Sequence, residues 1–376
     1  MNATNGTATD FLQFFQPPKE EIKVLISTAY ASLLLVALTA NLFVVFITLG
    51  NKSACNPPFN LFIIHLAACD ILYALVVCPV QLGYIYMQST WFQGSFALFL
   101  CKLKDFSLVF VISASVFTLV VMAVDRYLAA AHVLRRPMAK KHVWISLALV
   151  WCVSGLFSAS ELYKFKTYTV RSRNLNVTLC IASWTRDPNQ AENKMMAKVE
   201  FILKLILLYV IPLLTMVTLY GKIISFLWHR SASGTRRPAI QTSNRKRYRN
   251  IVHTLISMVA VFAGGWLPVH IVHLMSHFAR STTIRLPFVV YAFMFWTAHA
   301  NCAVNPCLIF VFNQDYRNKL RRLANRLQAC CSSLFIFCRL MKGRRKSYSC
   351  HNRGVTEIVC QRNSKEESTK TQDTKF

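Results

Sequence analysis

Seven long apolar segments, separated by short polar ones, dominate the hydrophobic pattern of the chain. A helix needs about 20 mostly apolar residues to cross the roughly 30 Å hydrocarbon core of a bilayer, because it rises 1.5 Å per residue. The segments that meet this requirement are Val24–Leu49, Phe59–Met87, Phe106–Val124, Val143–Ser160, Phe201–Leu227, Ile251–Met275 and Leu286–Phe312. The pattern predicts an all-α membrane protein in which residues 22–312 form a seven-transmembrane helix bundle. Pro212 and Pro268 are expected to break the fifth and sixth helices, which membrane helices tolerate.

The segments outside the bundle are polar. Residues 1–21 form a polar tail without the apolar core of a signal sequence, so the first helix is expected to direct its own insertion. Residues 313–327 are basic and amphipathic, which predicts a short eighth helix on the membrane surface. Residues 328–376 are expected to be a disordered cytoplasmic tail. Cys330 and Cys331 follow the eighth helix in a pattern typical of palmitoylation, although plain tail cysteines are the alternative.

The charge of the chain is strongly positive, with 43 Lys and Arg residues against 15 Asp and Glu residues. Such a balance often indicates nucleic-acid binding. Here the basic residues flank membrane-length segments, so an anionic inner membrane surface is the better partner. Most of them lie on the side of the C-terminus. The positive-inside rule therefore predicts a multi-pass plasma-membrane protein with an extracellular N-terminus and a cytoplasmic C-terminus.

The expected covalent modifications follow this orientation. Of thirteen cysteines, only Cys101 and Cys180 lie in extracellular segments. A disulfide needs an oxidising compartment, so these two cysteines are expected to form one. The glycosylation sequons that fall outside are at Asn2, Asn5 and Asn176.

Four polar side chains inside the spans form a candidate cation site. Polar residues are costly within a membrane and usually have a function there. Asp70, Ser115, Asn301 and Asn305 together offer carboxylate, hydroxyl and amide oxygens, which suit a small hard cation. The alternative is a hydrogen-bond network between helices.

An ordered series of short motifs carries a family resemblance. The motifs are Asn41, Leu66–Asp70, Trp91–Gly94, Asp125–Arg126–Tyr127, Trp151, Pro212, Tyr220, Phe262, Gly265–Pro268 and Asn305–Pro306. Together they resemble the rhodopsin-like (class A) G-protein-coupled receptors, over roughly residues 21–326.

The resemblance implies roles in signalling. Arg126 would engage the G protein once the sixth helix swings out, and Asp125 would restrain it beforehand. Phe262 and Trp266, with Val116 and Pro212, would relay ligand contact to that swing. The other residues expected to take part in activation are Tyr127, Tyr220, Pro268, Asn305 and Pro306. The four polar residues of the candidate cation site would bind an allosteric sodium ion.

Four positions depart from the family pattern, and one of them is Ala40, which replaces the glycine before Asn41. Ile309 stands where a tyrosine usually contacts Tyr220 in the active state, which puts that contact in doubt. Gly265 replaces a cysteine. Tyr248 stands where an acid sometimes pairs with Arg126.

The ligand class is narrowed by what the chain lacks. No aspartate stands at Leu108 to neutralise an amine, and His299 replaces the lysine that an opsin needs. The long polar outer loop of residues 162–196 and the aromatic outer half of the bundle look most like the neuropeptide-receptor branch. Small organic acids, suggested by Lys204, and lipids remain alternatives.

The expected ligand contacts line the outer half of the bundle: Gln81, Asp105, Leu108, Lys204, His270, His273, His277, Phe295 and His299. Asp105 could accept a basic side chain of the ligand, or pair with Lys102, Lys104 or a base of the loop. The three histidines from 270 to 277 share one helix face, where pocket lining is the common role and zinc binding the alternative.

Outside the receptor class, a secondary transporter is the alternative, but neither inverted repeats nor paired broken helices are evident. No catalytic motif predicts an enzyme. The expected partners are an extracellular peptide, a heterotrimeric G protein, membrane lipids, and receptor kinases and arrestin at the Ser/Thr-containing tail. No nucleic acid and no cofactor other than sodium is expected.

Overall fold

The computed structural model describes residues 19–50, 59–87, 90–131, 138–172, 175–186, 190–232, 239–278, 287–314, 316–325, 328, 348–352 and 358–362. Asn2, Asn5, Cys330 and Cys331 lie outside these residues, and so do the modifications expected at them. The chain divides into two compact units, Met1–Tyr316 and Arg317–Phe376.

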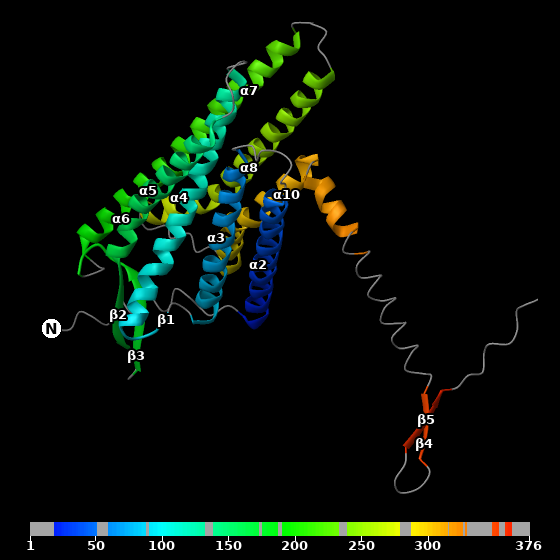
Figure 1. Ribbon diagram of the computed structural model, residues 1–376. Coiled ribbons are helices and arrows are strands. Elements are labelled where there is room, and N and C mark those ends of the chain that lie inside the picture. The colour runs from blue at the N-terminus through cyan, green and yellow to red at the C-terminus, as the bar shows by residue number, and fades with distance from the viewer. Residues whose placement is uncertain are drawn as a thin grey trace, which may run out of the picture. The chain divides into compact units, whose positions relative to one another are not determined.

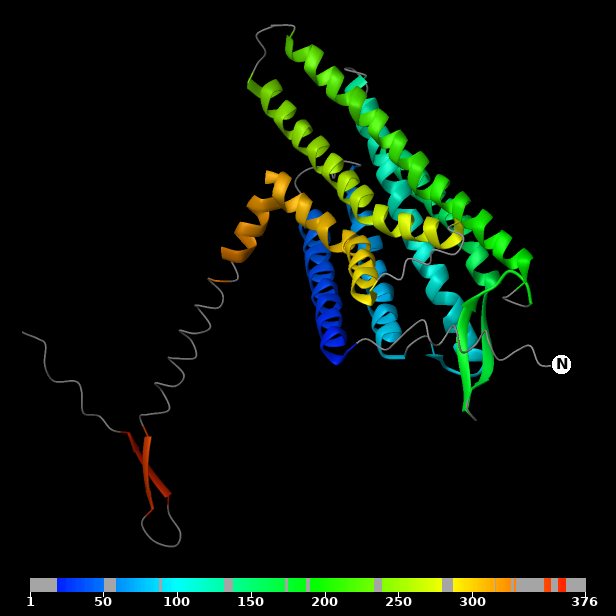
Figure 2. The ribbon, with the colours of Figure 1, turned by 180° about the vertical axis from the view of Figure 1, so that it is seen from behind.

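The first unit is a bundle of long helices that lie side by side, as two opposite views show (Figures 1 and 2). The helices are α2 (Glu20–Leu49), α3 (Phe59–Met87), α4 (Ser95–Ala131), α5 (Lys140–Lys164), α6 (Ala191–Leu205), η1 (Ile206–Val210), α7 (Ile211–Ala232), α8 (Ala239–Phe278), α9 (Phe288–His299) and α10 (Asn301–Phe312). Six spans are long and apolar enough to cross a membrane, and the pair α9–α10 makes a seventh. The seven predicted spans are therefore confirmed.

The fifth span passes Pro212 without the expected break. The segments α6, η1 and α7 follow one another directly, and η1 is a single π-helical turn. In this turn the Ile211 amide donates to the Ile206 carbonyl, one residue further back than in an α-helix. Pro212 comes next and has no amide hydrogen to donate. The helix therefore widens before the proline and continues, and Pro268 likewise lies inside the unbroken α8.

The seventh span is bent by 45° where α9 meets α10. Its break lies at Ala300, one residue before Asn301. The Asn301 side-chain amide donates to the Ala298 carbonyl over 2.8 Å. Asparagine side chains compete with helical hydrogen bonds in this way, which accounts for the bend beside this residue.

The helices bury small residues against one another and expose large ones on their outer faces. Ala37, Ala74 and Ala114 are almost completely buried in one apolar cluster, where short side chains let helices approach closely. Leu156 and Leu214 are among the large apolar residues left more than half exposed. Such an outer surface suits lipid rather than water.

The loop between α5 and α6 is a β-hairpin, which the sequence analysis did not predict. Strands β2 (Phe165–Ser172) and β3 (Leu175–Ala182) pair antiparallel, and β1 (Thr90–Trp91) adds to the free side of β3. Cys101 and Cys180 form the predicted disulfide, with an S–S distance of 2.01 Å. Asn176 is exposed on this hairpin. The end of the bundle that carries the hairpin is named the disulfide end below.

The second unit contains helical residues from 317 to 325, within the predicted eighth helix. Strands β4 (Tyr348–Asn352) and β5 (Ile358–Arg362) pair antiparallel in a segment that was expected to be disordered. The β-branched residues Ile358 and Val359 of β5 favour a strand.

Candidate functional site

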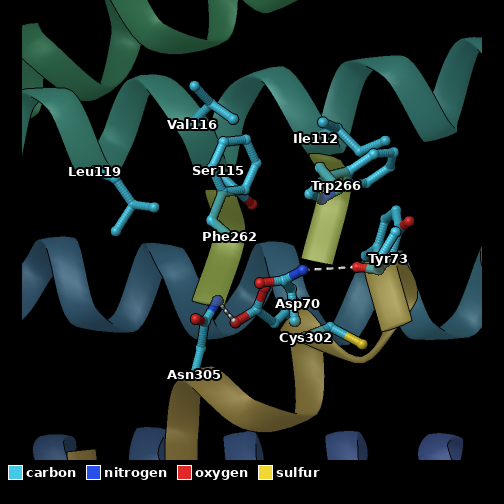
Figure 3. A pocket seen from close by; sticks show the side chains of 12 residues that line it. Asp70, Tyr73, Ile112, Ser115, Val116, Leu119, Phe262, Trp266, Cys302 and Asn305 are labelled. Carbon is cyan, nitrogen blue, oxygen red and sulfur yellow. Dashed lines mark hydrogen bonds between the residues drawn. The ribbon is translucent and has the colours of Figure 1, made fainter. Parts of the chain in front are cut away.

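The four predicted cation ligands lie around one cavity in the middle of the bundle (Figure 3). Asp70 on α3 is 5% exposed and accepts a hydrogen bond of 3.1 Å from the Asn305 amide on α10. Ser115 on α4 and Asn301 on α10 line the same cavity. The buried side-chain oxygen of Asn301 has no hydrogen-bond partner among the described residues. A carboxylate, a hydroxyl and an orphaned amide oxygen at one cavity fit a sodium ion.

Phe262 and Trp266 of α8 close the cavity on another side (Figure 3). Phe262 packs in an apolar cluster with Val116 of α4 and Tyr209 of η1. The Tyr209 and Phe262 ring centroids are 5.8 Å apart. The structure thus brings Val116, Phe262 and Trp266 of the predicted relay together. Pro212 is not part of this cluster, whereas Tyr209, which the sequence analysis missed, belongs to it.

Hydrogen bonds hold the seventh span, and Tyr316 just after it, to α2. The Asn41 amide donates to the Cys302 carbonyl over 2.9 Å. Pro306 cannot donate to that carbonyl, which lies four residues before it, so Asn41 supplies the missing hydrogen bond. Tyr30 and His299 share a hydrogen bond of 2.9 Å, and Thr48 and Tyr316 share one of 2.8 Å.

His299, one of the expected ligand contacts, is almost completely covered by other side chains of the bundle. It is 4% exposed, and its ring lies near those of Tyr30, Tyr73, Phe295 and Trp266, with centroids 5.8 to 6.5 Å away. It therefore joins aromatic side chains of α2, α3, α8 and α9 inside the bundle.

The other three histidines pack against aromatic rings. His273 and His277 lie 5.9 and 5.1 Å from Phe201, and His270 lies 4.5 Å from Tyr209, measured between ring centroids. The described residues contain no group of three His, Cys, Asp or Glu side chains that could hold a metal ion. The described residues therefore give no support to the zinc alternative for this stripe.

Four charged side chains form a closed ring between α5 and α6 at the disulfide end. Lys164 lies 3.0 Å from Glu161 and 2.7 Å from Glu200. Lys204 lies 2.5 Å from Glu200 and also pairs with Glu161. Lys204 was a predicted ligand contact, but both of its carboxylate partners were missed. Its charge is already compensated by the receptor, which weakens the case for a small organic acid as ligand.

The ring also fixes the hairpin of the outer loop. The Trp184 indole donates to Glu200 over 3.2 Å, just after β3 ends. Lys164 directly precedes β2. Both ends of the hairpin are thus tied to the same carboxylate.

Asp105 pairs with Lys104, its neighbour on α4. This is the predicted alternative in which Asp105 pairs with a base of the receptor rather than with a base of the ligand. Lys104 also donates to the Tyr84 hydroxyl over 3.0 Å. Its ammonium lies 4.9 Å from the Phe165 ring centroid and 5.8 Å from that of Trp91. The carboxylate and the rings around Lys104 compensate for the loss of water.

Two further expected ligand contacts lie on α3 and α4. Gln81 of α3 and Leu108 of α4 are both half-buried. Leu108 packs against the apolar cluster formed by α2, α3 and α4.

Arg126 lies at the opposite end of α4, which is named the arginine end below. Its Nε donates to Asp125 over 2.9 Å, and its guanidinium carbon lies 4.2 Å from the Phe59 ring centroid. The Tyr248 hydroxyl of α8 donates to the Arg126 backbone carbonyl over 2.6 Å. An acid at this position would pair with the Arg126 side chain. Tyr248 instead forms a hydrogen bond with the Arg126 backbone.

Tyr220 and Ile309 are both buried near this end. The Tyr220 hydroxyl has no hydrogen-bond partner among the described residues. Tyr127 packs against α7, with its ring centroid 6.1 Å from that of Phe226 and 5.8 Å from the Lys222 ammonium.

Comparison with known proteins agrees with this arrangement. Residues 40–308 match the model of the family described as 7 transmembrane receptor (rhodopsin family). The chain is 31% identical to the tachykinin-like peptides receptor 99D of Drosophila melanogaster over 78% of this chain and 56% of the relative. It is 28% identical to the tachykinin-like peptides receptor 86C of the same organism, over 84% and 60%.

The match to these two relatives thus spans little more than half of their length. A third relative, the QRFP-like peptide receptor of Branchiostoma floridae, is 29% identical over 83% of both chains. The family match covers six of the seven spans fully or almost fully and the end of α2. The chain belongs to the rhodopsin family of seven-transmembrane receptors.

Proposed function

We propose that the chain is a plasma-membrane receptor that binds an extracellular peptide at the disulfide end and activates a heterotrimeric G protein at the arginine end. One observation carries the proposal: α4 alone bears Cys101 of the disulfide and the Asp125–Arg126 pair. The 24 residue steps between Cys101 and Asp125 correspond to about 36 Å, roughly one bilayer, at 1.5 Å per residue. The positive-inside rule supports a cytoplasmic arginine end.

A peptide ligand is supported by the relatives, three of which are named as peptide receptors. The side chains toward the disulfide end of the bundle also suit a peptide. Aromatic and imidazole rings such as Phe201, His273 and Phe295 offer apolar contacts with a few polar groups between them, and the charges nearby are paired within the receptor. A base of the peptide would have to displace Lys104 to reach Asp105.

The test is a peptide library applied to cells that express the full chain with cAMP and calcium reporters. We expect at least one peptide to stimulate nucleotide exchange in wild-type membranes, and Arg126→Ala to bind that peptide without stimulating exchange. Flux of a small solute into vesicles, with no nucleotide exchange for any peptide, would instead indicate a transporter.

We infer that Asp70, Ser115, Asn301 and Asn305 bind sodium in the resting receptor. Agonist affinity should then fall when Na⁺ replaces N-methylglucamine, because sodium favours the state that binds agonist less well. Asp70→Asn should remove this dependence while keeping the hydrogen bond to Asn305 possible. An unchanged sodium response in the variant would refute the sodium site. The four residues would then form only a hydrogen-bond network between helices.

The modifications and intracellular partners complete the proposal. Asn2, Asn5 and Asn176 would carry glycans, and Cys330 and Cys331 would be palmitoylated where the tail meets membrane lipid. Receptor kinases and arrestin would act on the Ser/Thr-containing tail. Mass spectrometry of the purified receptor, with and without enzymatic deglycosylation and hydroxylamine, would test the covalent modifications.

A further inference from the structure

The middle of α8 contains the weakest turn of that helix. Pro268 has no amide hydrogen, so the carbonyl of Gly264, four residues earlier, loses its helical partner. Gly264 and Gly265 add conformational freedom at the same place. Helices bend sharply at prolines and at pairs of small residues. Residues 264–268 are therefore where the two halves of α8 can bend relative to one another, and they are called the α8 hinge here.

A side chain of the fifth span contacts the α8 hinge at its edge. The Tyr209 hydroxyl of η1 donates to the carbonyl of Ala263, the residue just before the hinge, over 2.7 Å. Tyr209 is 8% exposed, and its ring packs on Phe262 and His270, which lie on either side of the hinge. One tyrosine thus contacts both halves of α8.

The π turn determines where Tyr209 points. The extra residue in η1 rotates the preceding part of the helix by roughly 100° relative to a continuous α-helix, since each residue turns about 100°. Tyr209 is the only residue of η1 that is buried. The widened turn therefore directs this side chain toward α8.

We propose that the hydrogen bond from Tyr209 to Ala263 is a latch that holds the α8 hinge in its resting conformation and breaks when the receptor is activated. Tyr209 is then a positioning residue for signalling, acting through α8. The link to signalling rests on the proposed function, whereas the effect on the hinge does not. The hydrogen bond is partly buried, and the ring contacts with Phe262 and His270 remain when the hydroxyl alone is removed.

Tyr209→Phe tests the latch in the full-length receptor in lipid nanodiscs. Amide hydrogen exchange of residues 260–267 should accelerate by about 2- to 10-fold, the effect of losing one hydrogen bond. Exchange in the middle of α4 should not change. The matched control is Tyr291→Phe, because Tyr291 is a half-buried tyrosine of α9. Unchanged exchange in residues 260–267 would overturn the latch, whatever the receptor does to a G protein.

The same variant tests the link to signalling. Ligand-independent nucleotide exchange, measured per receptor at matched surface level, should rise by about 2- to 10-fold. If the hinge loosens and wild-type receptor responds to a peptide, but basal activity stays at the wild-type level, the latch has no role in activation and the proposal fails. If no peptide stimulates the wild-type chain either, the proposed function fails, and faster exchange at the hinge still supports the latch.

Discussion

The two ends of the bundle are held together by different kinds of interaction. At the disulfide end, a covalent bond, a three-stranded sheet and a ring of four charges connect α4, α5 and α6. At the arginine end, Arg126 pairs with its own neighbour Asp125, and single contacts from Phe59 and Tyr248 connect it to other helices. The first end is built to keep its shape, and the second can separate at the cost of a few weak interactions.

The largest effect is expected from breaking the charge ring. Glu161→Ala would leave Lys164 and Lys204 to share Glu200, with too little compensation for two largely buried ammonium groups. Losing one partner of a buried ion pair costs about 3–5 kcal/mol. We expect a matching fall in the thermal stability of the purified receptor. Glu192→Ala removes an exposed acid from the same region of α6 and is the control. Equal stability of the two variants would show that the ring contributes little.

Removing the disulfide should have the next largest effect. Cys101→Ser removes the covalent bond between two residues that are 79 apart in sequence, so β3 is no longer bonded to α4. Loss of such a bond costs about 2–4 kcal/mol. Surface level and peptide affinity should both fall, as flow cytometry and ligand binding would measure. Cys152→Ser replaces an exposed free cysteine of α5 and should be neutral. Normal affinity at normal surface level in Cys101→Ser would contradict the assigned role of this end.

A smaller effect is expected midway between the ends, where Gly265 lets α8 approach the seventh span. An added Cβ would lie 2.8 Å from the Asn301 amide nitrogen and 3.0 Å from the Thr297 carbonyl oxygen. Gly265→Ala should therefore destabilise the receptor by about 1–3 kcal/mol through overpacking.

The neighbouring Gly264 is the matched control for that substitution. A Cβ at Gly264 would meet no atom within 4 Å. Gly264→Ala should stabilise the helix by about 0.5–1 kcal/mol, because alanine loses less backbone entropy than glycine. Thermal unfolding of the two variants should thus shift in opposite directions. A shift in the same direction would show that the close approach does not constrain α8.

The smallest effect is expected at the arginine end. Tyr248→Phe removes one hydrogen bond between α8 and α4, worth about 0.5–1.5 kcal/mol. Basal nucleotide exchange should rise severalfold with little change in thermal stability. Tyr163→Phe makes the same chemical change at the disulfide end, where Tyr163 packs on Trp184. Its basal exchange should equal that of the wild type. Higher basal activity in Tyr163→Phe would remove the distinction between the two ends.

Sequence reasoning predicted the features that depend on composition and order along the chain. The seven spans follow from apolar length, and the Cys101–Cys180 bond follows from which cysteines lie outside. The gathering of Asp70 and Asn305 at one cavity was also predicted, because polar residues within spans turn toward the bundle interior.

Features that depend on the exact rotation of each helix were missed. The partners of Lys204 are Glu161, 43 residues away on another helix, and Glu200, one turn earlier. Sequence spacing alone does not show that both carboxylates reach the same ammonium. The contact of Tyr209 with Ala263 depends on a single π turn, which has no reliable sequence signal. The bend of the seventh span similarly depends on one side-chain hydrogen bond of Asn301.

The hydrogen bonds between α2 and the seventh span have a consequence for how the receptor is made. Tyr30, Asn41 and Thr48 are among the first membrane residues to be synthesised, but their partners follow more than 260 residues later. Asn41 and Thr48 also donate to the carbonyls of Ala37 and Val44 within α2 itself. Until α9 enters the bilayer, the Tyr30 hydroxyl therefore faces hydrocarbon or a temporary neighbour, and an unsatisfied polar group there costs several kcal/mol. The last span therefore completes the packing of the first. A nascent chain cut short before α9 would retain an α2 whose Tyr30 hydroxyl lacks its His299 partner, a feature by which cellular quality control can distinguish it from a finished receptor.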